Sequence, residues 1–574
     1  HDKAHNSSLG TGPKVKGSRR QNRCLDPPPS SPDIVRVATF AVLMTMHPVQ
    51  TFELVLLLLA FVFALYWVAL KLRFPPAAVM LVGGGALAFL PGVPAITLNP
   101  QLALVLFLPP LLVHGAIFIP LGRFRRNLPG ILSLAVGGVI FTTLAVGLVM
   151  HWLAPALPWA ACFALGAIVS PPDAVSAGAV LKGVKLPRRL KTLLEGESLL
   201  NDATGLILFR FAVAAALSGT FSLASAAQSF VVVSIGGALV GVVMGAAWVF
   251  LVRHLSDRML IIGVTMMSSW IVYITGEALH VSGVIAVVVG GLVHGWYQHT
   301  VINADVRLPT RSLGEVVSFV LEAQVFILIG FSLRGVVERM GGIEALPAAT
   351  VEIVLGVIVA LTLARFLWVF ARDGIITLAR RFGVPSARPL GWREATVLSW
   401  AGMRGVVTLA IALTLPDNMP GRDLMLLCAF AVIFVTVIVQ GSSLGLLVRL
   451  VRPVDLEPLA NVSMAGAEAA ITRARNATIE QLAYAEDGSL LHPQLLEESQ
   501  RRMRFMERYE VDTDAVMGGL NAHYNVLVKA NAASRAELVR LHRAGEIEDE
   551  VMHNLERDLD IEQMAMFFQF SLEE

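Results

Sequence analysis

Long apolar runs separated by short charged segments constrain the fold of this chain more than any other feature. Runs of about 18 or more apolar residues are typical of transmembrane helices, because a helix of about 20 residues crosses the hydrocarbon core of a bilayer. Only 15% of the residues are charged, against about 25% in soluble domains. The pattern therefore predicts an all-α membrane protein that crosses the bilayer many times.

Roughly 13 such spans can be placed along the chain. Their approximate limits are 50–71, 75–92, 100–121, 129–153, 159–181, 193–218, 225–252, 259–278, 281–298, 313–335, 347–371, 393–415 and 424–448. The connecting segments are short, so no separate domain lies between any two spans.

Basic residues alternate between the connecting segments. The segments after odd-numbered spans are rich in Lys and Arg, with Lys182–Lys191 as the densest cluster. The segments after even-numbered spans carry only Arg334, Arg339 and Arg422. By the positive-inside rule, the odd segments and the C-terminus face the cytoplasm and the N-terminus lies outside. The expected location is the cell (inner) membrane.

The two ends of the chain differ from the apolar middle. Residues 1–43 are polar, basic and rich in Pro and Ser, which predicts a disordered N-terminal extension rather than a signal peptide. Met44 or Met46 would make a natural start. Residues 44–454 form the expected transmembrane domain.

Residues 455–574 lack a membrane-length apolar run. Ala533–Arg543 and Ile547–Leu559 show helical apolar spacing with charged opposite faces. A cytoplasmic helical domain is expected, either regulatory, in contact with a second copy, or simply a solvated tail.

Two adjacent prolines interrupt the fifth span at Pro171 and Pro172, directly before Asp173. Proline removes a backbone donor and clashes with the preceding turn, so the helix should break there. A break at membrane depth is tolerated only where it is buried or lines a cavity, and its free ends can offer dipoles to an ion. The alternative is a kinked helix in which Asp173 merely caps the second half.

The sixth span carries an array of oxygens on one side. Ser198 and Asp202 are four residues apart, as are Glu197 and Asn201, and the two stripes adjoin. Carboxylates inside a bilayer are costly, so they indicate a function. Hard cations such as sodium bind several oxygens, and this array supplies them. The alternative is a polar contact between helices.

Two arginines lie within later spans. Arg365 is in the middle of the eleventh, and Arg404 in the twelfth, where Gly402 and Gly405 indicate a second break. Buried arginines need carboxylate partners. Glu197 is the expected partner for one of them, which would leave Asp202 able to titrate. For Arg404 the alternative is a side chain that extends to the cytoplasmic face.

These motifs, taken together, resemble the sodium/proton exchangers of the cation:proton antiporter-1 family. The resemblance covers about residues 50–450 and rests on Glu197-Ser198-x-x-Asn201-Asp202, the preceding Ser-Pro-Pro-Asp173 break, and the segments around Arg365 and Arg404. It implies about 13 helices with inverted repeats, two broken helices, a core bundle and a dimer domain. It also implies a homodimer with a role in pH homeostasis.

The resemblance further implies roles for individual residues. Asp202 would bind the cation and the proton in turn, and Asp173, Ser198 and the backbone of Pro172 would add oxygens around Na⁺. Glu197 would pair with Arg365 and hold the core bundle together. The Asn-Asp pair, in place of two Asp, implies electroneutral one-for-one exchange.

The chain departs from the family pattern at two positions. Pro172 stands where the family often has Thr, which removes one hydroxyl. His114, in Leu108-Pro-Pro-Leu-Leu-Val-His114, stands at a position where Glu is common in the family. That Glu would often form a hydrogen bond with the Asn that corresponds to Asn201. We expect His114 either to replace that Glu and titrate near neutral pH or to be structural. These departures bear on ion selectivity, among Na⁺, Li⁺ and K⁺, and on pH response more than on the reaction class.

Other functions fit the sequence less well. A cation channel would use a similar polar path without proton coupling, and a membrane sensor would depend on residues 455–574. An enzyme would need an activated nucleophile, which neither acidic position supplies. No P-loop, dinucleotide fingerprint or HExxH motif occurs. The expected partners are a monovalent cation, the proton and lipid, with neither a resident cofactor nor nucleic acid.

Overall fold

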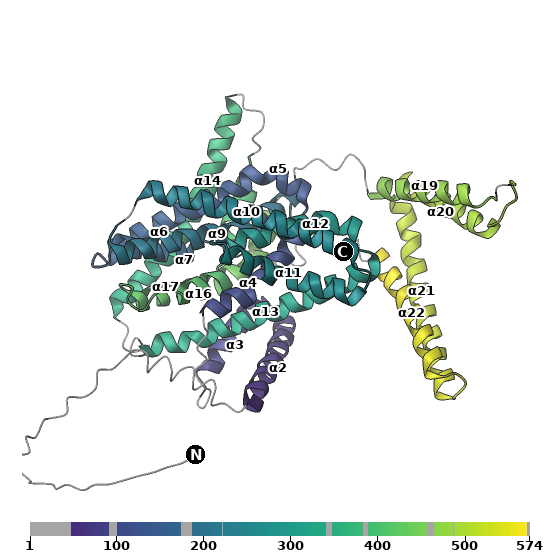
Figure 1. The fold of residues 1–574 in the computed structure, drawn as a ribbon, viewed down its shortest axis with the longest axis horizontal. Helices are drawn as coiled ribbons and strands as arrows, with labels where there is room; N and C mark the ends of the chain where they lie inside the picture. Colours follow the sequence, from purple (N-terminus) through teal and green to yellow (C-terminus); the bar gives the residue numbers. More distant parts are fainter. Residues whose placement is uncertain are drawn as a thin grey trace, which may run out of the picture. The chain divides into compact units, whose positions relative to one another are not determined.

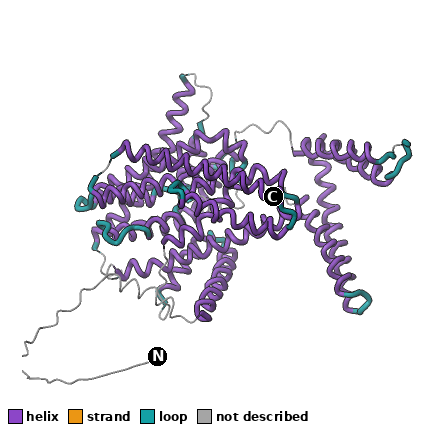
Figure 2. The backbone as a smooth tube through the Cα atoms, viewed as in Figure 1, coloured by secondary structure: helices purple, strands orange, loops and turns teal. Residues whose placement is uncertain are grey.

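The computed structural model describes residues 48–90, 100–173, 186–220, 222–339, 342, 347–382, 389–455, 464–485, 487–511 and 513–570. Every regular element in these ranges is a helix (Figures 1 and 2), which confirms the all-α prediction. The chain divides into two compact units, His1–Asp455 and Leu456–Glu574. The predicted extension at 1–43 lies outside the described residues, and the functions assigned to 44–454 and 455–574 stay predictions.

The first unit consists of helices of very different lengths. They are α2 (Pro48–Leu72), α3 (Pro76–Ala88), α4 (Pro100–Phe118), α5 (Leu121–Leu132), α6 (Val139–Leu153), α7 (Trp159–Val169), α9 (Arg188–Ser218), α10 (Leu223–His254), α11 (Arg258–Ala278), α12 (Gly283–Val301), α13 (Ala304–Arg339), α14 (Ala348–Arg381), α15 (Trp392–Trp400), α16 (Val406–Leu413), α17 (Arg422–Val435) and α18 (Gly441–Val451), with π-helical turns η1 (Ser133–Gly138) and η3 (Thr436–Gln440).

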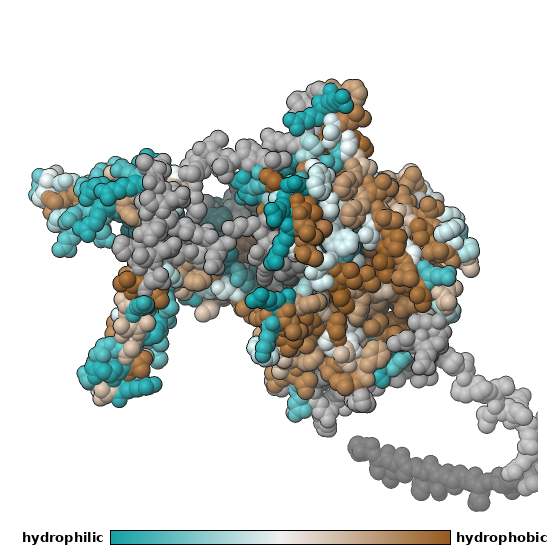
Figure 3. Space-filling view, turned by 180° about the vertical axis from the view of Figure 1, so that it is seen from behind, coloured by the Kyte–Doolittle hydropathy of each residue, from teal (hydrophilic) through white to brown (hydrophobic). Residues whose placement is uncertain are grey.

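Each predicted span overlaps one of these helices or a consecutive set of them. By length and composition, 7 helices in the described part of the chain could cross a membrane, and several apolar helices are shorter. The membrane-spanning character of the chain is therefore confirmed, whereas the count of about 13 spans and the inverted repeats stay predictions. Apolar side chains cover much of the outer surface of this unit (Figure 3), as a lipid-facing surface requires.

One boundary differs from the prediction. The basic segment Arg123–Arg126 was expected in a loop but belongs to α5, which continues through η1 into α6. Helix α5 buries Phe124 and Ile131 while its basic residues lie on another face. An amphipathic helix can hold such residues at a membrane surface without a loop.

Glycines bring pairs of helices into backbone contact. On α10, Gly237, Gly241 and Gly245 lie one turn apart, and a Cβ atom on Gly241 would come within 2.5 Å of Ala286 O on α12. On α3, a Cβ atom on Gly84 would come within 2.3 Å of Ile327 O on α13. Small residues at this spacing are the usual means of close helix packing in membranes.

Both predicted helix breaks are present. Helix α7 ends at Val169, directly before Ser170-Pro171-Pro172, and residues 174–185 lie outside the described part. The twelfth span consists of α15 and α16, and residues 402–405 between them have no helical structure. The prolines and glycines thus end the helices where backbone chemistry requires it.

The second unit contains two helical pairs, α19 (Met464–Leu482) with α20 (Pro493–Val511), and α21 (Thr513–Arg543) with α22 (Asp549–Phe570). The helices predicted at 533–543 and 547–559 are confirmed in substance. Asn531 on α21 donates to Leu559 O on α22 over 3.2 Å. At the turn between α21 and α22 the His542 ring lies 2.6 Å from Asp549, a contact that lowers the pKa of this carboxyl.

Candidate functional site

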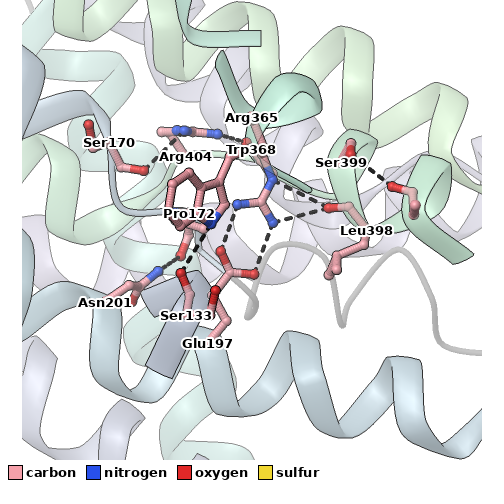
Figure 4. A network of polar contacts seen from close by, with 12 residues as sticks. Ser133, Ser170, Pro172, Glu197, Asn201, Arg365, Trp368, Leu398, Ser399 and Arg404 are labelled. Carbon is pink, nitrogen blue, oxygen red and sulfur yellow. Dashed lines mark hydrogen bonds and ion pairs between the residues drawn. The ribbon is translucent and has the colours of Figure 1, made fainter. Parts of the chain in front are cut away.

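The two breaks are bonded directly to each other. The backbone N–H of Asp173 donates to Met403 O over 2.7 Å. In the opposite direction, Arg404 Nε donates to Val169 O over 2.8 Å and Nη2 donates to Ser170 O over 3.1 Å (Figure 4). Residues more than 200 positions apart therefore form one polar junction inside the helical unit.

Arg404 closes the C-terminal end of α7. The last carbonyls of a helix have no partner within the helix, and a cation at that end is favoured by the helix dipole. Only 2% of Arg404 is exposed, so its side chain does not extend to the cytoplasmic face. The contacts that the structure gives it are carbonyls, including Gly402 O, and not the carboxylate that its sequence position suggested. The backbone N–H of Arg404 donates to Thr436 Oγ1 over 3.0 Å.

Arg365 on α14 makes the other arginine contact. Its Nη1 and Nη2 donate to Glu197 Oε1 and Oε2 over 2.7 and 3.0 Å, a bidentate pair. Its Nε and Nη2 also donate to Leu398 O, in the last turn of α15, over 3.3 and 3.1 Å (Figure 4). The structure thus brings together the two groups that the family resemblance paired. Their role in holding the core bundle during transport stays a prediction.

Asn201 connects α9 to the first break. Its Nδ2 donates to Pro172 O over 2.5 Å (Figure 4). Its Oδ1 is buried and has no hydrogen-bond partner among the described residues. Buried polar atoms are nearly always paired, so such an oxygen indicates a position for a bound water or ion.

The carboxylates lie beside this amide. Asp202 follows Asn201 on α9 and is 7% exposed, and it interacts electrostatically with Asp173 at the first break. The Asp173 side chain packs on the second break so closely that a Cβ atom on Gly405 would overlap its Oδ2. Ser198, one turn before Asp202, is half-buried. Oxygens from α9 and from the first break therefore meet beside the second break.

The predicted Na⁺ ligands Asp202, Asp173 and Ser198 stay a prediction. Among the described residues there is no group of three or more His, Cys, Asp or Glu side chains that could hold a metal ion. An alkali cation needs oxygens rather than such a cluster, and carboxylate, amide and carbonyl oxygens are the ligand types present. A cavity of about 10 Å³ lies between Ser170, Glu197 and Arg365, which is about the space for one water.

Among the contacts that the structure describes, no hydrogen bond joins His114 to Asn201, and both alternatives for His114, replacing a Glu or being structural, stay predictions. Asn201 Nδ2 is directed at Pro172 O, and its Oδ1 has no partner in the described part of the chain. His114 lies on α4, where its ring packs edge-on against Phe118 at 4.9 Å between centroids. It lines a separate cavity of about 760 Å³, because α4 directs this turn towards α13.

Three contacts of the site have no signal in the sequence. Leu398 contributes only its carbonyl, and Thr436 contributes a hydroxyl from a π-helical turn. Trp368 Nε1 donates to Ser133 O, in the other π-helical turn, over 3.1 Å. The residue type does not indicate which backbone carbonyl accepts a hydrogen bond. A π-helical turn also leaves no mark in the spacing of apolar residues.

Comparison with known proteins agrees with these features. The family model described as "Sodium/hydrogen exchanger, transmembrane" matches residues 33–450. A sodium, potassium, lithium and rubidium/H⁺ antiporter of Bacillus pumilus is 32% identical over 69% of this chain and 61% of its own length. A similarly named protein of Bacillus subtilis is 35% identical, over 61% of this chain and 54% of its own. The chain thus spans less than two thirds of these two relatives.

An uncharacterized Na⁺/H⁺ exchanger of Mycobacterium bovis is 30% identical over 86% of this chain and 92% of its own length. Among solved structures, the sodium proton antiporter MjNhaP1 of Methanocaldococcus jannaschii matches with a TM-score of 0.56 at 19% identity, covering 70% of this chain and 98% of that one. At this identity, the match to the solved structure shows similarity of fold alone. By the extent of the family match and the identity to the mycobacterial protein, the chain belongs to the sodium/hydrogen exchanger family.

Proposed function

We propose that this protein is a secondary active antiporter that exchanges Na⁺ for H⁺ by alternating access, with Li⁺ or K⁺ as alternative cations. Family membership supports the reaction class. The names of the two Bacillus relatives, sodium, potassium, lithium and rubidium/H⁺ antiporters, support the breadth of cations.

The observation that carries the proposal is the junction of α9 with the first break. Buried Asp202 directly follows Asn201, whose Oδ1 has no donor among the described residues. Pro172 O is held in the same place by Asn201 Nδ2. An uncompensated carboxylate among such oxygens binds either a proton or a cation, because an empty charged site inside the bilayer is costly.

Competition for Asp202 couples the two fluxes. When protonated, Asp202 is neutral, and when a monovalent cation is bound, the pair is neutral. Either loaded form can cross between the two access states, whereas the empty anion cannot do so readily. The Asn-Asp pair at 201–202, in place of two Asp, supports exchange of one proton for one cation by resemblance to the family, which makes the cycle electroneutral. Asp173, Ser198 and Pro172 O complete the cation's oxygens.

The membrane arrangement follows from the charge pattern. We place the protein in the cell (inner) membrane with its N-terminus outside and residues 455–574 in the cytoplasm, because basic residues concentrate in the odd-numbered connecting segments. A homodimer is part of the proposal, as the family resemblance implies. The transported ions and the proton are the only small ligands that the cycle requires.

The test is proton flux in reconstituted vesicles, with Na⁺, Li⁺ and K⁺ gradients applied in turn. We expect Asp202→Asn to abolish cation-driven proton movement, because the amide cannot carry the proton. Asp417→Asn is the matched control, since that carboxylate is 88% exposed and far less constrained, and exchange should be unchanged. Exchange retained by a folded Asp202→Asn protein would sink the assignment. Cation current without proton movement in the unsubstituted protein would instead indicate a channel.

A further inference from the structure

A cavity of about 760 Å³ lies between α4, α11, α12 and the first turns of α13. It is separate from the ion site, since Glu197, Asn201 and Asp202 are not among its described lining residues. Its volume falls within the range of sites that enclose an organic ligand, about 300–1,000 Å³. None of the residues to which the proposed exchange assigns a role is among the described lining residues of this cavity.

The charged side chains that line the cavity are cationic. They are Arg307 and Arg311, and no Asp or Glu occurs among the described lining residues; His114, His294 and His299 add ring nitrogens. A surface of this charge repels the transported cation and attracts an anion.

The two arginines differ in how far their charge is neutralised. Arg307 Nη1 donates to Ile302 O over 3.2 Å, and Arg307 forms no ion pair with any residue that the structure describes. Arg311 Nε donates to Glu315 Oε1 over 3.1 Å, but this i,i+4 pair is more than half exposed on both side chains. An exposed pair of that kind is weak. Arg307 therefore carries an unmatched positive charge, and that of Arg311 is only partly screened.

Most of the remaining wall is apolar or aromatic, although Thr265, Ser269 and Gln298 also line it. Trp270 and Trp296 line the cavity together with Met266 and Leu292. The guanidinium of Arg311 lies 5.2 Å from the centre of the Phe118 ring. A site with cations at one part and apolar walls at the rest suits a molecule with an anionic head and a hydrocarbon body. A small hydrated anion would leave most of this surface unused.

We propose that this cavity binds one anionic phospholipid, with its phosphate at Arg307 and Arg311 and the upper part of an acyl chain against Trp270 and Leu292. The basic segment that contains both arginines faces the cytoplasm by the positive-inside rule. The cytoplasmic leaflet is the one that presents anionic lipid, and basic pockets between membrane helices bind such headgroups. This inference goes beyond the proposed exchange and does not depend on it.

The experiment uses the full chain in detergent, with native mass spectrometry to count bound lipids and a thermal melt to measure stabilisation. Phosphatidylglycerol, phosphatidylcholine, inorganic phosphate and glycerol phosphate are added separately. We expect one tightly retained phosphatidylglycerol per chain and a higher melting temperature, with little effect of the other three additives. The double variant Arg307→Gln/Arg311→Gln should bind this lipid about tenfold or more weakly.

The matched control is Arg253→Gln/Arg258→Gln, which removes the same charge from two exposed arginines of another cytoplasmic segment. It should retain the lipid. If the first variant fails to fold, Gly314→Leu offers a second test, because a Cβ atom there faces His114 Nδ1 at 3.5 Å and Met266 at 3.9 Å and so fills the cavity. Undiminished phosphatidylglycerol binding by the folded cavity variants would overturn the proposal, as would equal retention of phosphatidylcholine or equal stabilisation by inorganic phosphate.

Discussion

The two helix breaks are built alike but carry opposite charges. At each, an arginine from another segment closes the C-terminal end of the half-helix: Arg404 at Val169 O and Ser170 O, and Arg365 at Leu398 O. The first break then continues into a carboxylate, Asp173, whereas the second continues into a guanidinium. At both breaks an arginine thus binds the helix carbonyls that lack partners within the helix. The carboxylate after the first break suits the proposed binding of ions, whereas the guanidinium after the second break suits binding to the first break.

The two arginines also differ in what balances their charge. Arg365 has the Glu197 carboxylate, while the contacts of Arg404 are backbone carbonyls and their dipoles. This difference predicts that substitutions around Arg365 act mainly on folding. Substitutions on the Asp173 side of the junction should act mainly on transport. The changes below test that division, from the largest expected effect to the smallest.

Glu197→Gln should have the largest effect on stability, about 3–5 kcal/mol, because it leaves the buried charge of Arg365 without a carboxylate. The apparent melting temperature in detergent measures it. Glu338→Gln is the matched control, since its pair with Arg334 is exposed and should contribute at most about 1 kcal/mol. The double variant Glu197→Gln/Arg365→Gln should recover part of the loss. Equal destabilisation by Glu197→Gln and Glu338→Gln would contradict a structural role for the buried pair.

Arg404→Gln should cost about 2–3 kcal/mol, because two charge-assisted hydrogen bonds to the end of α7 are lost. No buried carboxylate is left unpaired, so the loss should be smaller than for Glu197→Gln. Arg404→Lys should recover little, since one ammonium cannot reproduce the fixed fork of a guanidinium. Melting temperatures of both variants give the comparison. Full stability of the Lys variant would show that charge alone suffices at this position.

The glycines of the second break separate transport from stability. A Cβ atom on Gly405 would overlap Asp173 Oδ2, and one on Gly402 would overlap Arg365 Cδ. Gly405→Ala should therefore displace a proposed ligand and raise the apparent KM for the cation on the order of tenfold or more. Gly402→Ala should instead lower the melting temperature.

The measurements are cation-dependent proton flux and thermal unfolding of each variant. Gly445→Ala serves as the control, because a Cβ atom there meets nothing within 4 Å. An unchanged KM in Gly405→Ala, or a KM shift of equal size in Gly402→Ala, would remove the distinction between the two sides of the junction.

Thr436→Val should have the smallest effect, about 1 kcal/mol, because it removes one acceptor from the backbone N–H of Arg404. The shape of the side chain is nearly kept, so packing should change little. The melting temperature should fall slightly, and the apparent KM should stay the same. A large KM change would place η3 among the elements that shape the ion site.

Local chemistry explains which parts of this architecture could be predicted. Pro171 and Pro172 end α7, and Gly402 and Gly405 flank the gap before α16, because these residues act on their own backbone. Residue type alone indicated that Glu197 would pair with one of the two embedded arginines. The choice of Arg365 came from the resemblance to the exchanger family, and the structure shows that pair.

The remaining site contacts required coordinates. Arg404 donates to backbone carbonyls at the end of α7. Because every residue has a backbone carbonyl, no sequence pattern identifies which carbonyls it binds. His114 occupies the sequence position of a site residue, yet the direction of α4 places it in the larger cavity. The direction of a side chain depends on how its helix is rotated about its own axis. When several faces of a membrane helix are apolar, the spacing of apolar residues does not define that rotation.

The bonds that cross between the breaks have a consequence for selectivity. Asp173 N–H to Met403 O and Arg404 to Val169 O and Ser170 O fasten the two interrupted helices at the depth of the ion site. If access alternates by motion of this junction as one piece, the distances between the cation's oxygens stay constant throughout the cycle. The protein would then rank Na⁺, Li⁺ and K⁺ in the same order from either side of the membrane, so the imposed gradients alone would determine the direction of transport.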